Sequence, residues 1–279
     1  MARTLSTRRT FLATAASLPL AAKMSNGKIP VGLELYSVRD ELAKDQDGTL
    51  RAVAKIGYQC VEFFAPYYKW EVAHAKSIRK LLDDLGMRCY STHNDRGNFE
   101  KDKIGHAIEL NQILGAKYVV MASAGEVRTL DGWKRVAQTL QEASEELASH
   151  NLEPGYHNHE LEFMPIGGVK PIEVIAKNTN KSVMLQLDVG TCIDAGSDPV
   201  AWIEKNPGRI RSIHCKDWSR SGGYKVLFGE GVAPWKKIFH AAENGGGVEY
   251  YLIEQEGSRY PALETVTKCL KTFKKIHGA

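Results

Sequence analysis

From residue 29 onward, short apolar runs alternate with longer amphipathic segments. Eight such runs recur at intervals of roughly 25 to 40 residues, which is enough for one β-strand and one helix each. The runs are Val31–Tyr36, Val61–Phe64, Met87–His93, Tyr118–Met121, Glu153–His159, Val183–Asp188, Ile210–His214 and Tyr250–Glu254. The pattern therefore predicts eight consecutive βα units.

The segments between these runs have the period of amphipathic helices. Ser77–Leu85 carries apolar residues at i, i+3, i+4 and i+7, and Trp133–His150 is the longest segment of this kind. Gly57, Gly86 and Gly115 each follow an amphipathic run and precede a strand. Such glycines are typical of the left-handed residue that ends a helix.

Eight units of this kind favour one α/β domain, a closed (β/α)8 barrel spanning residues 29–276. A doubly wound open sheet would also alternate strands with helices. However, no glycine-rich phosphate fingerprint follows the first strand, and such sheets usually have about six strands. We therefore expect a single TIM barrel with no second domain.

Residues 1–22 differ from the rest of the chain. Arg3, Arg8 and Arg9 precede a short apolar stretch that begins at Phe11, and this segment contains no acidic residue. A basic start followed by a short apolar run is typical of an export signal. Thr7–Leu12 resembles the twin-arginine signal, which is recognised by an export machinery. We predict a periplasmic or exported protein, while cleavage of the signal and a cytoplasmic protein with a basic N-terminus stay open.

The remaining composition excludes little but gives no sign of nucleic-acid binding. Removing residues 1–22 removes three positive and no negative charges, so the net charge falls from +4 to +1. A net charge this close to zero gives little support for binding to phosphate backbones. The five cysteines form no CxxC pair, and we expect buried thiols rather than disulfides.

Residues of the metal-ligand type gather at the ends of the last four predicted strands. The fifth ends in His157 and His159, the sixth in Asp188, the seventh in His214 and the eighth in Glu254. In an α/β barrel the carboxyl ends of the strands form the active-site face. Imidazole and carboxylate groups together suit Mn²⁺, Zn²⁺, Co²⁺ or Fe²⁺ better than Mg²⁺ or Ca²⁺. We expect one divalent ion, with Mn²⁺ as the first choice.

Without a metal, the same residues would form a buried ion-pair network at the barrel mouth, with Lys216 and Asp217 pairing locally. This alternative stays open at the level of sequence, because strand-end carboxylates also occur in purely structural networks.

Several segments together resemble the xylose-isomerase-like barrels, also called the sugar phosphate isomerase/epimerase group. The resemblance covers roughly residues 29–275. It rests on Gly32–Asp40, Val61–Phe63, Tyr156–His159, Leu187–Gly190, His214–Asp217, Gly229–Gly231 and Ile253–Glu254. The family usually holds its metal with Glu, Asp, His and Glu from strands five to eight, and Asp188, His214 and Glu254 match the last three.

The fifth strand departs from this family pattern. His157 stands where the family often has Glu, with His159 two residues later. A His-x-His fifth strand resembles that of the inosose dehydratase-like members. His157 aligns best as the fourth ligand, and His159 and Glu162 are the alternatives for this position. The change also argues against simple isomerase chemistry, in which the Glu is both ligand and base.

Further residues are candidates for the substrate pocket. Glu62 and His93 end the second and third strands, where the family lines its substrate pocket, and are expected to bind substrate, although His93 could instead start a helix. Glu230 lies in a loop that could reach over the site. Lys216 could hold a substrate oxygen or take part in catalysis, or could be an ordinary ion-pair partner. Trp70 and Trp218 could face a sugar ring, or could simply pack.

The resemblance implies a metal-dependent sugar-modifying enzyme that removes a proton next to a carbonyl, through an enediolate that the metal stabilises. His159 or Glu162 would move protons. The fifth strand and the predicted export favour lyase or dehydratase action on a keto-sugar or keto-glycoside. An isomerase or epimerase acting on a free ketose is the alternative, and a non-enzymatic periplasmic sugar-binding module is a second.

A metal-dependent endonuclease, which shares this fold, is disfavoured by the charge and by the small number of clustered ligands. The expected partners are a sugar or glycoside and the export machinery, and a homo-oligomer is left open.

Overall fold

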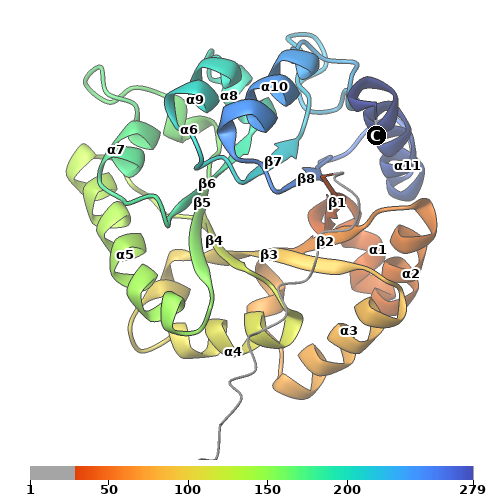
Figure 1. The fold of residues 1–279 in the computed structure, drawn as a ribbon. Coiled ribbons are helices and arrows are strands. Elements are labelled where there is room, and N and C mark those ends of the chain that lie inside the picture. The colour runs from red at the N-terminus through yellow and green to blue at the C-terminus, as the bar shows by residue number, and fades with distance from the viewer. Residues whose placement is uncertain (1–28, 279) are drawn as a thin grey trace, which may run out of the picture.

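Eight parallel strands form a closed barrel in the computed structural model, which describes residues 29–278. The strands surround the centre of the view in Figure 1, and helices form a ring outside them. The strands are β1 (Val31–Glu34), β2 (Cys60–Phe63), β3 (Arg88–Asp95), β4 (Tyr118–Ser123), β5 (Glu153–His157), β6 (Met184–Asp188), β7 (Ser212–Cys215) and β8 (Tyr250–Ile253). Each predicted strand overlaps one of these, so the predicted (β/α)8 barrel is confirmed.

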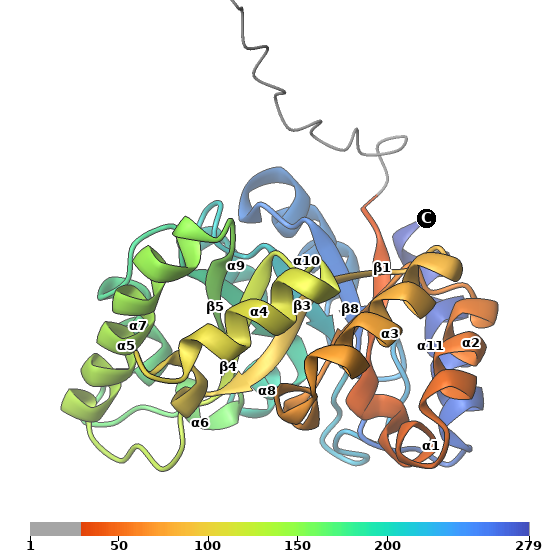
Figure 2. The same cartoon turned by 90° about the horizontal axis from the view of Figure 1, so that it is seen from below.

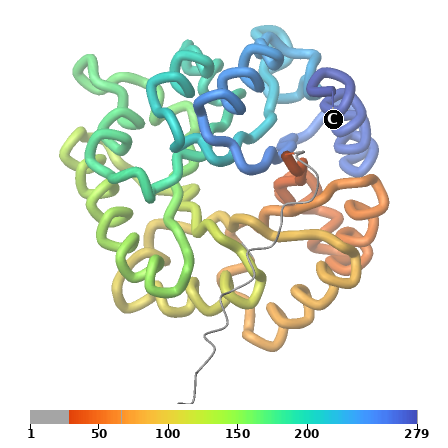
Figure 3. Tube along the Cα trace, viewed as in Figure 1, coloured from red at the N-terminus to blue at the C-terminus, as the bar shows by residue number. Residues whose placement is uncertain are grey.

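Pairing between the first and last strands closes the barrel. Leu33 of β1 lies in register with Ile253 of β8. Figure 3 shows the trace running once around the barrel, so that its red beginning lies beside its blue end. This closure brings the carboxyl ends of all the strands to one face of the molecule.

The helices cover the outside of the barrel, as the side view in Figure 2 also shows. They are α1 (Arg39–Lys44), α2 (Gln46–Ile56), α3 (Val72–Asp84), α4 (Ile104–Leu114), α5 (Leu130–Ser149), α6 (Glu160–Phe163), α7 (Pro171–Lys177), α8 (Val189–Asp194), α9 (Pro199–Lys205), α10 (Trp235–Ala241) and α11 (Ala262–His277). Gly57, Gly86 and Gly115 have φ values of 105°, 68° and 73°, which confirms the predicted left-handed helix ends.

Two apolar clusters stabilise the fold. The larger lies between strands and helices, and the smaller consists of inward-facing residues such as Cys60, Tyr118, Met184 and Tyr250. Successive residues of a strand face opposite sides, so inward positions recur every second residue. On β6 the series Met184, Gln186, Asp188 therefore runs from the apolar interior of the barrel to its polar mouth.

Further expectations from the sequence concern the cysteines and the N-terminal segment. Each of the five cysteines is a buried free thiol, as predicted. Within residues 29–278, no helix is both long enough and apolar enough to span a membrane. The predicted export signal lies outside the described residues.

Candidate metal centre and cavity

At the polar end of the barrel, four side chains lie close enough together to bind one metal ion. His157, Asp188, His214 and Glu254 each offer one ligand atom, and these atoms lie within 4.8 Å of one another. All four residues are buried. The first three lie on β5, β6 and β7, and Glu254 directly follows β8. The strand ends therefore bring together residues that are up to 97 positions apart in the sequence.

Asp188 is held in place by the start of α8, and one of its oxygens accepts no hydrogen bond from the described residues. Its Oδ1 accepts a hydrogen bond of 2.9 Å from the backbone N–H of Thr191, and its own N–H donates to Asn158 Oδ1 at 3.0 Å. Its buried Oδ2 has no hydrogen-bond partner in the described chain. Burial raises the pKa of this carboxyl group, which Lys216 partly offsets. Lys216 Nζ lies 3.4 Å from this oxygen as an ion-pair partner without a hydrogen bond, so a metal ion would supply the direct partner that the oxygen lacks.

His214 lies between two carboxylates. Its Nε2 is 2.8 Å from Glu62 Oε2, and its Nδ1 is 2.6 Å from Glu254 Oε2. Burial alone would lower the pKa of His214, but Glu62 and Glu254 outweigh burial and raise the pKa to about 10. Without a metal the ring is therefore an imidazolium that donates to both carboxylates.

Glu62 also orients the second histidine of the site, through Gln186. A carboxylate can only accept, so the 2.9 Å contact between Gln186 Nε2 and Glu62 Oε1 fixes which end of the amide is the nitrogen. Gln186 Oε1 then accepts from His157 Nδ1 at 3.0 Å. Burial, together with His214 and His93, lowers the pKa of His157 well below its usual range. His157 is thus neutral, with the lone pair on Nε2.

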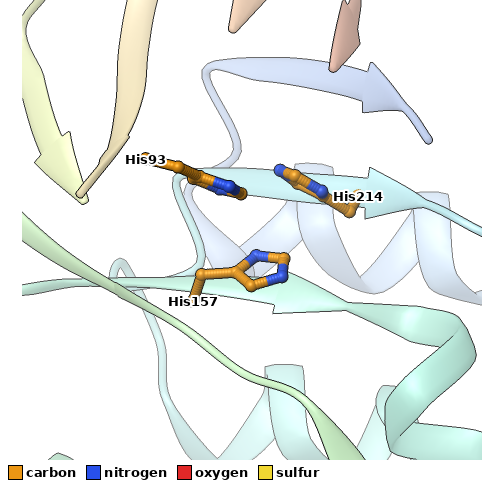
Figure 4. Close-up of side chains that lie close together, drawn as sticks. All are labelled: His93, His157 and His214. Carbon is orange, nitrogen blue, oxygen red and sulfur yellow. The ribbon is translucent and has the colours of Figure 1, made fainter. Parts of the chain in front are cut away.

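The imidazole rings of His93, His157 and His214 lie close together, as Figure 4 shows. His93 and His214 are stacked with 5.2 Å between ring centroids, and His157 lies 4.5 Å from His214. His93 Nε2 is also 2.9 Å from Glu62 Oε2. Burial would raise the pKa of Glu62, but His93 and His214 hold it well below its usual range. Glu62 is therefore the anionic support of the histidine cluster.

These observations fit a divalent ion. The donors available to it are Nε2 of His157, Oδ2 of Asp188, Nδ1 of His214 and the carboxylate of Glu254. Two nitrogens and two carboxylates suit Zn²⁺, Mn²⁺, Co²⁺ or Fe²⁺. Glu62 and Gln186 would supply the outer hydrogen bonds that such ligand histidines commonly have.

A cavity of about 540 Å³ opens beside this cluster. His157 and Glu254 contribute to its lining, together with His93 and His159. The described lining comes mainly from the ends of β1 to β5 and β8 and the segments that follow them. A small molecule in this cavity would therefore contact the cluster directly.

Residues 50–275 match the family described as xylose isomerase-like TIM barrel. The chain belongs to this family. The resemblance inferred from the sequence motifs is thereby confirmed.

Two characterised relatives of this xylose isomerase-like barrel are similar at low identity. Inosose dehydratase of Mesomycoplasma hyopneumoniae is 28% identical over 217 residues, which are 70% of this chain and 71% of that enzyme. Rhizopine catabolism protein MocC of Rhizobium meliloti is 24% identical over 189 residues, covering 60% of this chain and 56% of MocC. The alignment thus spans little more than half of MocC.

A solved structure extends this comparison to nearly the whole fold. A sugar phosphate isomerase/epimerase from Parabacteroides distasonis superposes with a TM-score of 0.76 at 27% identity, covering 91% of this chain and 96% of that one. Both dehydratases and isomerases or epimerases are therefore among the similar proteins.

The other site residues predicted from the sequence lie in different surroundings. His93, His159 and Glu162 line the cavity, and His159 is exposed. Both oxygens of Glu162 are already engaged, with the Tyr156 hydroxyl at 2.7 Å and the His159 N–H at 2.8 Å. Glu162 therefore holds the loop after β5, whereas His159 is exposed at the cavity.

Lys216 lies among carboxylates rather than in the cavity lining. Its Nζ is 3.4 Å from Asp188 Oδ2 and 3.2 Å from Glu254 Oε1, and it also pairs with Glu256. Burial would lower the pKa of Lys216, but the three carboxylates raise it well above its usual range. It is therefore a fixed ammonium and is unsuited to act as a base. The expected local pair with Asp217 does not occur, because Asp217 instead accepts from Trp235 Nε1 at 2.8 Å.

Three expected substrate contacts lie outside the described cavity lining. Glu62 is completely buried beneath the histidines. Glu230 is bound by Arg259 at 2.7 Å near the surface. Trp70 packs edge-on against Phe63, with 5.0 Å between the centroids. The aromatic side chains that do line the cavity are Tyr36 and Phe64.

Sequence reasoning did not select Glu34 or Gln186 as site residues. Glu34 lines the cavity, and Gln186 carries the hydrogen bond that orients His157. Both could have been found from the two-residue alternation of strand side chains. Glu34 lies two positions after Gly32 in β1, and Gln186 lies two positions before Asp188 in β6, so each faces the same side as that residue.

Proposed function

We propose that this protein is a divalent-metal-dependent enzyme that removes a proton next to the carbonyl group of a polyhydroxylated ketone and then expels a β-oxygen substituent. The convergence of His157, Asp188, His214 and Glu254 beside the cavity carries this proposal. A bound metal would act as a Lewis acid that polarises the carbonyl and lowers the cost of the negative charge that forms on its oxygen.

The chain's own residues supply the remaining parts. His159 lies at the cavity and is exposed, so its ring can take a proton from a carbon and exchange it with solvent. Glu62 and Gln186 hold the histidine ligands in one orientation. The ammonium of Lys216 balances the charge of Asp188 and Glu254.

The fifth strand supports elimination rather than isomerisation. This chain has His157 at the fifth-strand position where a carboxylate could carry a proton between two carbons. His157 is neutral and donates to Gln186 through Nδ1, so it does not take over that role. In elimination, the proton goes to His159, the bond between the β-carbon and its oxygen breaks, and the departing oxygen takes a proton to leave as water or an alcohol. The relative named inosose dehydratase supports this choice.

The test is proton exchange and product formation by protein loaded with Mn²⁺. Inosose, a 3-keto-glucoside and D-fructose are each incubated in D₂O, and NMR follows deuterium next to the carbonyl and the appearance of eliminated product. We expect elimination with the first two, no activity for Asp188→Asn, and unchanged activity for Glu230→Gln, which lies outside the cavity.

Epimerised or isomerised ketose without an elimination product would instead support isomerase or epimerase action, the activity named for the similar Parabacteroides distasonis protein. Metal-loaded protein that binds these compounds but exchanges no proton would contradict an enzymatic function and favour a sugar-binding module.

We also propose that residues 1–22 direct export by the twin-arginine route. The paired Arg8 and Arg9 before an apolar stretch support this proposal. Fractionation of cells that express the full chain, with Arg8→Lys and Arg9→Lys together as the matched change, tests it. Unchanged recovery of the double variant outside the cytoplasm would contradict it.

A further inference from the structure

The cavity is lined by carboxyl groups and histidines. Its lining includes six acidic residues, and no lysine or arginine of residues 29–278 contributes to it. The acidic residues are Glu34, Asp95, Glu160, Glu162, Glu254 and Glu256. Lys216 is the buried cation nearby, and its charge is already shared among Asp188, Glu254 and Glu256. The lining therefore offers a phosphate group none of the cationic donors that usually bind it.

Glu34 is the least explained of these acidic residues. It ends β1, is 1% exposed, and its Oε2 accepts a 2.8 Å hydrogen bond from the backbone N–H of Tyr36. This bond fixes the side chain at the start of the short 3-10 helix Leu35–Val38. Its Oε1 is buried and has no hydrogen-bond partner among the described residues.

Capping the helix does not account for a glutamate at this position. The cap uses one oxygen, and a smaller Ser, Thr or Asn can provide such a bond without placing a second polar atom in the interior. Leaving a buried polar atom unsatisfied costs free energy unless a ligand meets it. Burial, and then the nearby Glu254, raises the pKa of Glu34 well above its usual range.

The side chains next to Glu34 provide an apolar wall. Tyr36 and Phe64 both line the cavity, and their rings meet edge-on with 5.3 Å between centroids. An aromatic wall beside hydrogen-bonding groups suits a ring compound that has C–H groups on one face and hydroxyl groups at its edge.

We propose that the cavity selects an uncharged polyhydroxy ketone, that Oε1 of Glu34 binds one of its hydroxyl groups, and that phosphorylated sugars are excluded. A neutral ligand needs no cationic partner, whereas a phosphate dianion would meet Asp95, Glu160 and Glu162 in the lining and no lysine or arginine that could bind it. This inference rests on the proposed function and adds the class of substrate to it.

The exclusion of phosphorylated sugars is tested with a matched pair of probes. D-Fructose and D-fructose 1-phosphate differ in the phosphate group and can form the same six-membered ring, and inosose serves as the uncharged carbocyclic compound. Binding to Mn²⁺-loaded protein is measured by calorimetry, and exchange of the proton next to the carbonyl is measured in D₂O. We expect the phosphate ester to bind at least about tenfold more weakly than fructose. Equal or tighter binding of the ester would overturn the inference and leave the proposed function standing.

The role of Glu34 is tested with Glu34→Leu, Glu34→Gln and a series of monodeoxy inososes. A typical hydrogen bond corresponds to a factor of about 2 to 13 in affinity. We expect Glu34→Leu to raise KM for inosose by about five- to tenfold with little change in kcat. Glu34→Gln keeps a polar atom at this position and should restore most of the loss.

One deoxy analogue should bind wild type and Glu34→Leu equally, because it lacks the hydroxyl group that Glu34 meets. A purely structural role would instead lower the melting temperature and leave the discrimination among analogues unchanged, which would overturn the assignment. Absence of proton exchange by wild-type protein with every probe would overturn the proposed function itself, and this inference with it.

Discussion

Metal uptake should release a proton from His214. In the metal-free protein this ring has carboxylates at 2.8 Å and 2.6 Å from its two nitrogens, and its pKa is raised to about 10. A metal needs the lone pair of Nδ1, so the proton there must leave. With that pKa, about 0.9 of the His214 rings are protonated at pH 9 and nearly all at pH 7.5. We therefore expect about 0.9 proton released per Mn²⁺ bound at pH 9.

Replacing Glu62 by Gln should shift this proton release to lower pH. A hydrogen bond to a charged group contributes about 1.5–3 kcal/mol, which corresponds to about 1–2 pKa units. The pKa of His214 should then fall to about 8–9, and the protons released at pH 9 should fall to about 0.1–0.5 per ion. At pH 7.5 the variant should still release about 0.8 proton or more, because most rings remain protonated there.

Calorimetry in buffers of different ionisation enthalpy measures the protons released per ion. Mn²⁺ is preferred to Zn²⁺, because water bound to Zn²⁺ in a protein can itself lose a proton near pH 7. Glu230→Gln serves as a control, since its side chain pairs with Arg259 outside the cavity. Wild-type protein that releases no proton at pH 9, or a Glu62→Gln variant identical to it at that pH, would refute the role assigned to the Glu62–His214 pair.

Three other changes test separate parts of the structure. Asp188→Asn should weaken Mn²⁺ binding by more than about 100-fold in equilibrium dialysis, since changes to outer hydrogen-bond partners alone cost about 10–100-fold; an unchanged affinity would remove Asp188 from the site. His159→Gln should slow proton exchange in D₂O by about 10²–10⁴-fold with Mn²⁺ affinity unchanged, and equal rates would exclude His159 as the base. Gly32→Ala places a Cβ 2.6 Å from the Cys60 carbonyl oxygen and should lower the free energy of unfolding in urea by about 1–3 kcal/mol. Gly105→Ala, whose Cβ meets no described atom within 4 Å, should be neutral or slightly stabilising, and similar losses in both would contradict the packing argument.

The barrel and the candidate metal-binding cluster were predictable because both follow from simple periodicities. Eight βα units of similar length imply closure, and residues at the carboxyl ends of strands must then meet at one face. Asp188, His214 and Glu254 were predictable from their strand-end positions together with the family resemblance. His157 was harder to select, because His159 lies on the same face of an extended strand; in the structure β5 ends at His157, and His159 belongs to the loop.

The hydrogen-bond partners of the cluster could not be predicted in the same way. Glu62 and Gln186 act through contacts that span 152 and 29 positions of sequence, and these depend on how far each strand is shifted along the barrel. Sequence position suggested a substrate contact for Glu62, whereas its depth in the barrel makes it a support for His214. The direction of a loop side chain could not be predicted either. Glu230 could turn toward the cavity or toward Arg259, and the pattern of the sequence does not distinguish the two.

The central claim, that one divalent ion is held by the ends of the last four strands, is tested most directly by anomalous diffraction from crystals soaked with Zn²⁺. The account predicts one strong peak about 2.0–2.2 Å from Nε2 of His157, Oδ2 of Asp188, Nδ1 of His214 and a carboxylate oxygen of Glu254. An anomalous map without a peak at these four residues, or with its peak on His93 and Glu62 instead, would contradict it.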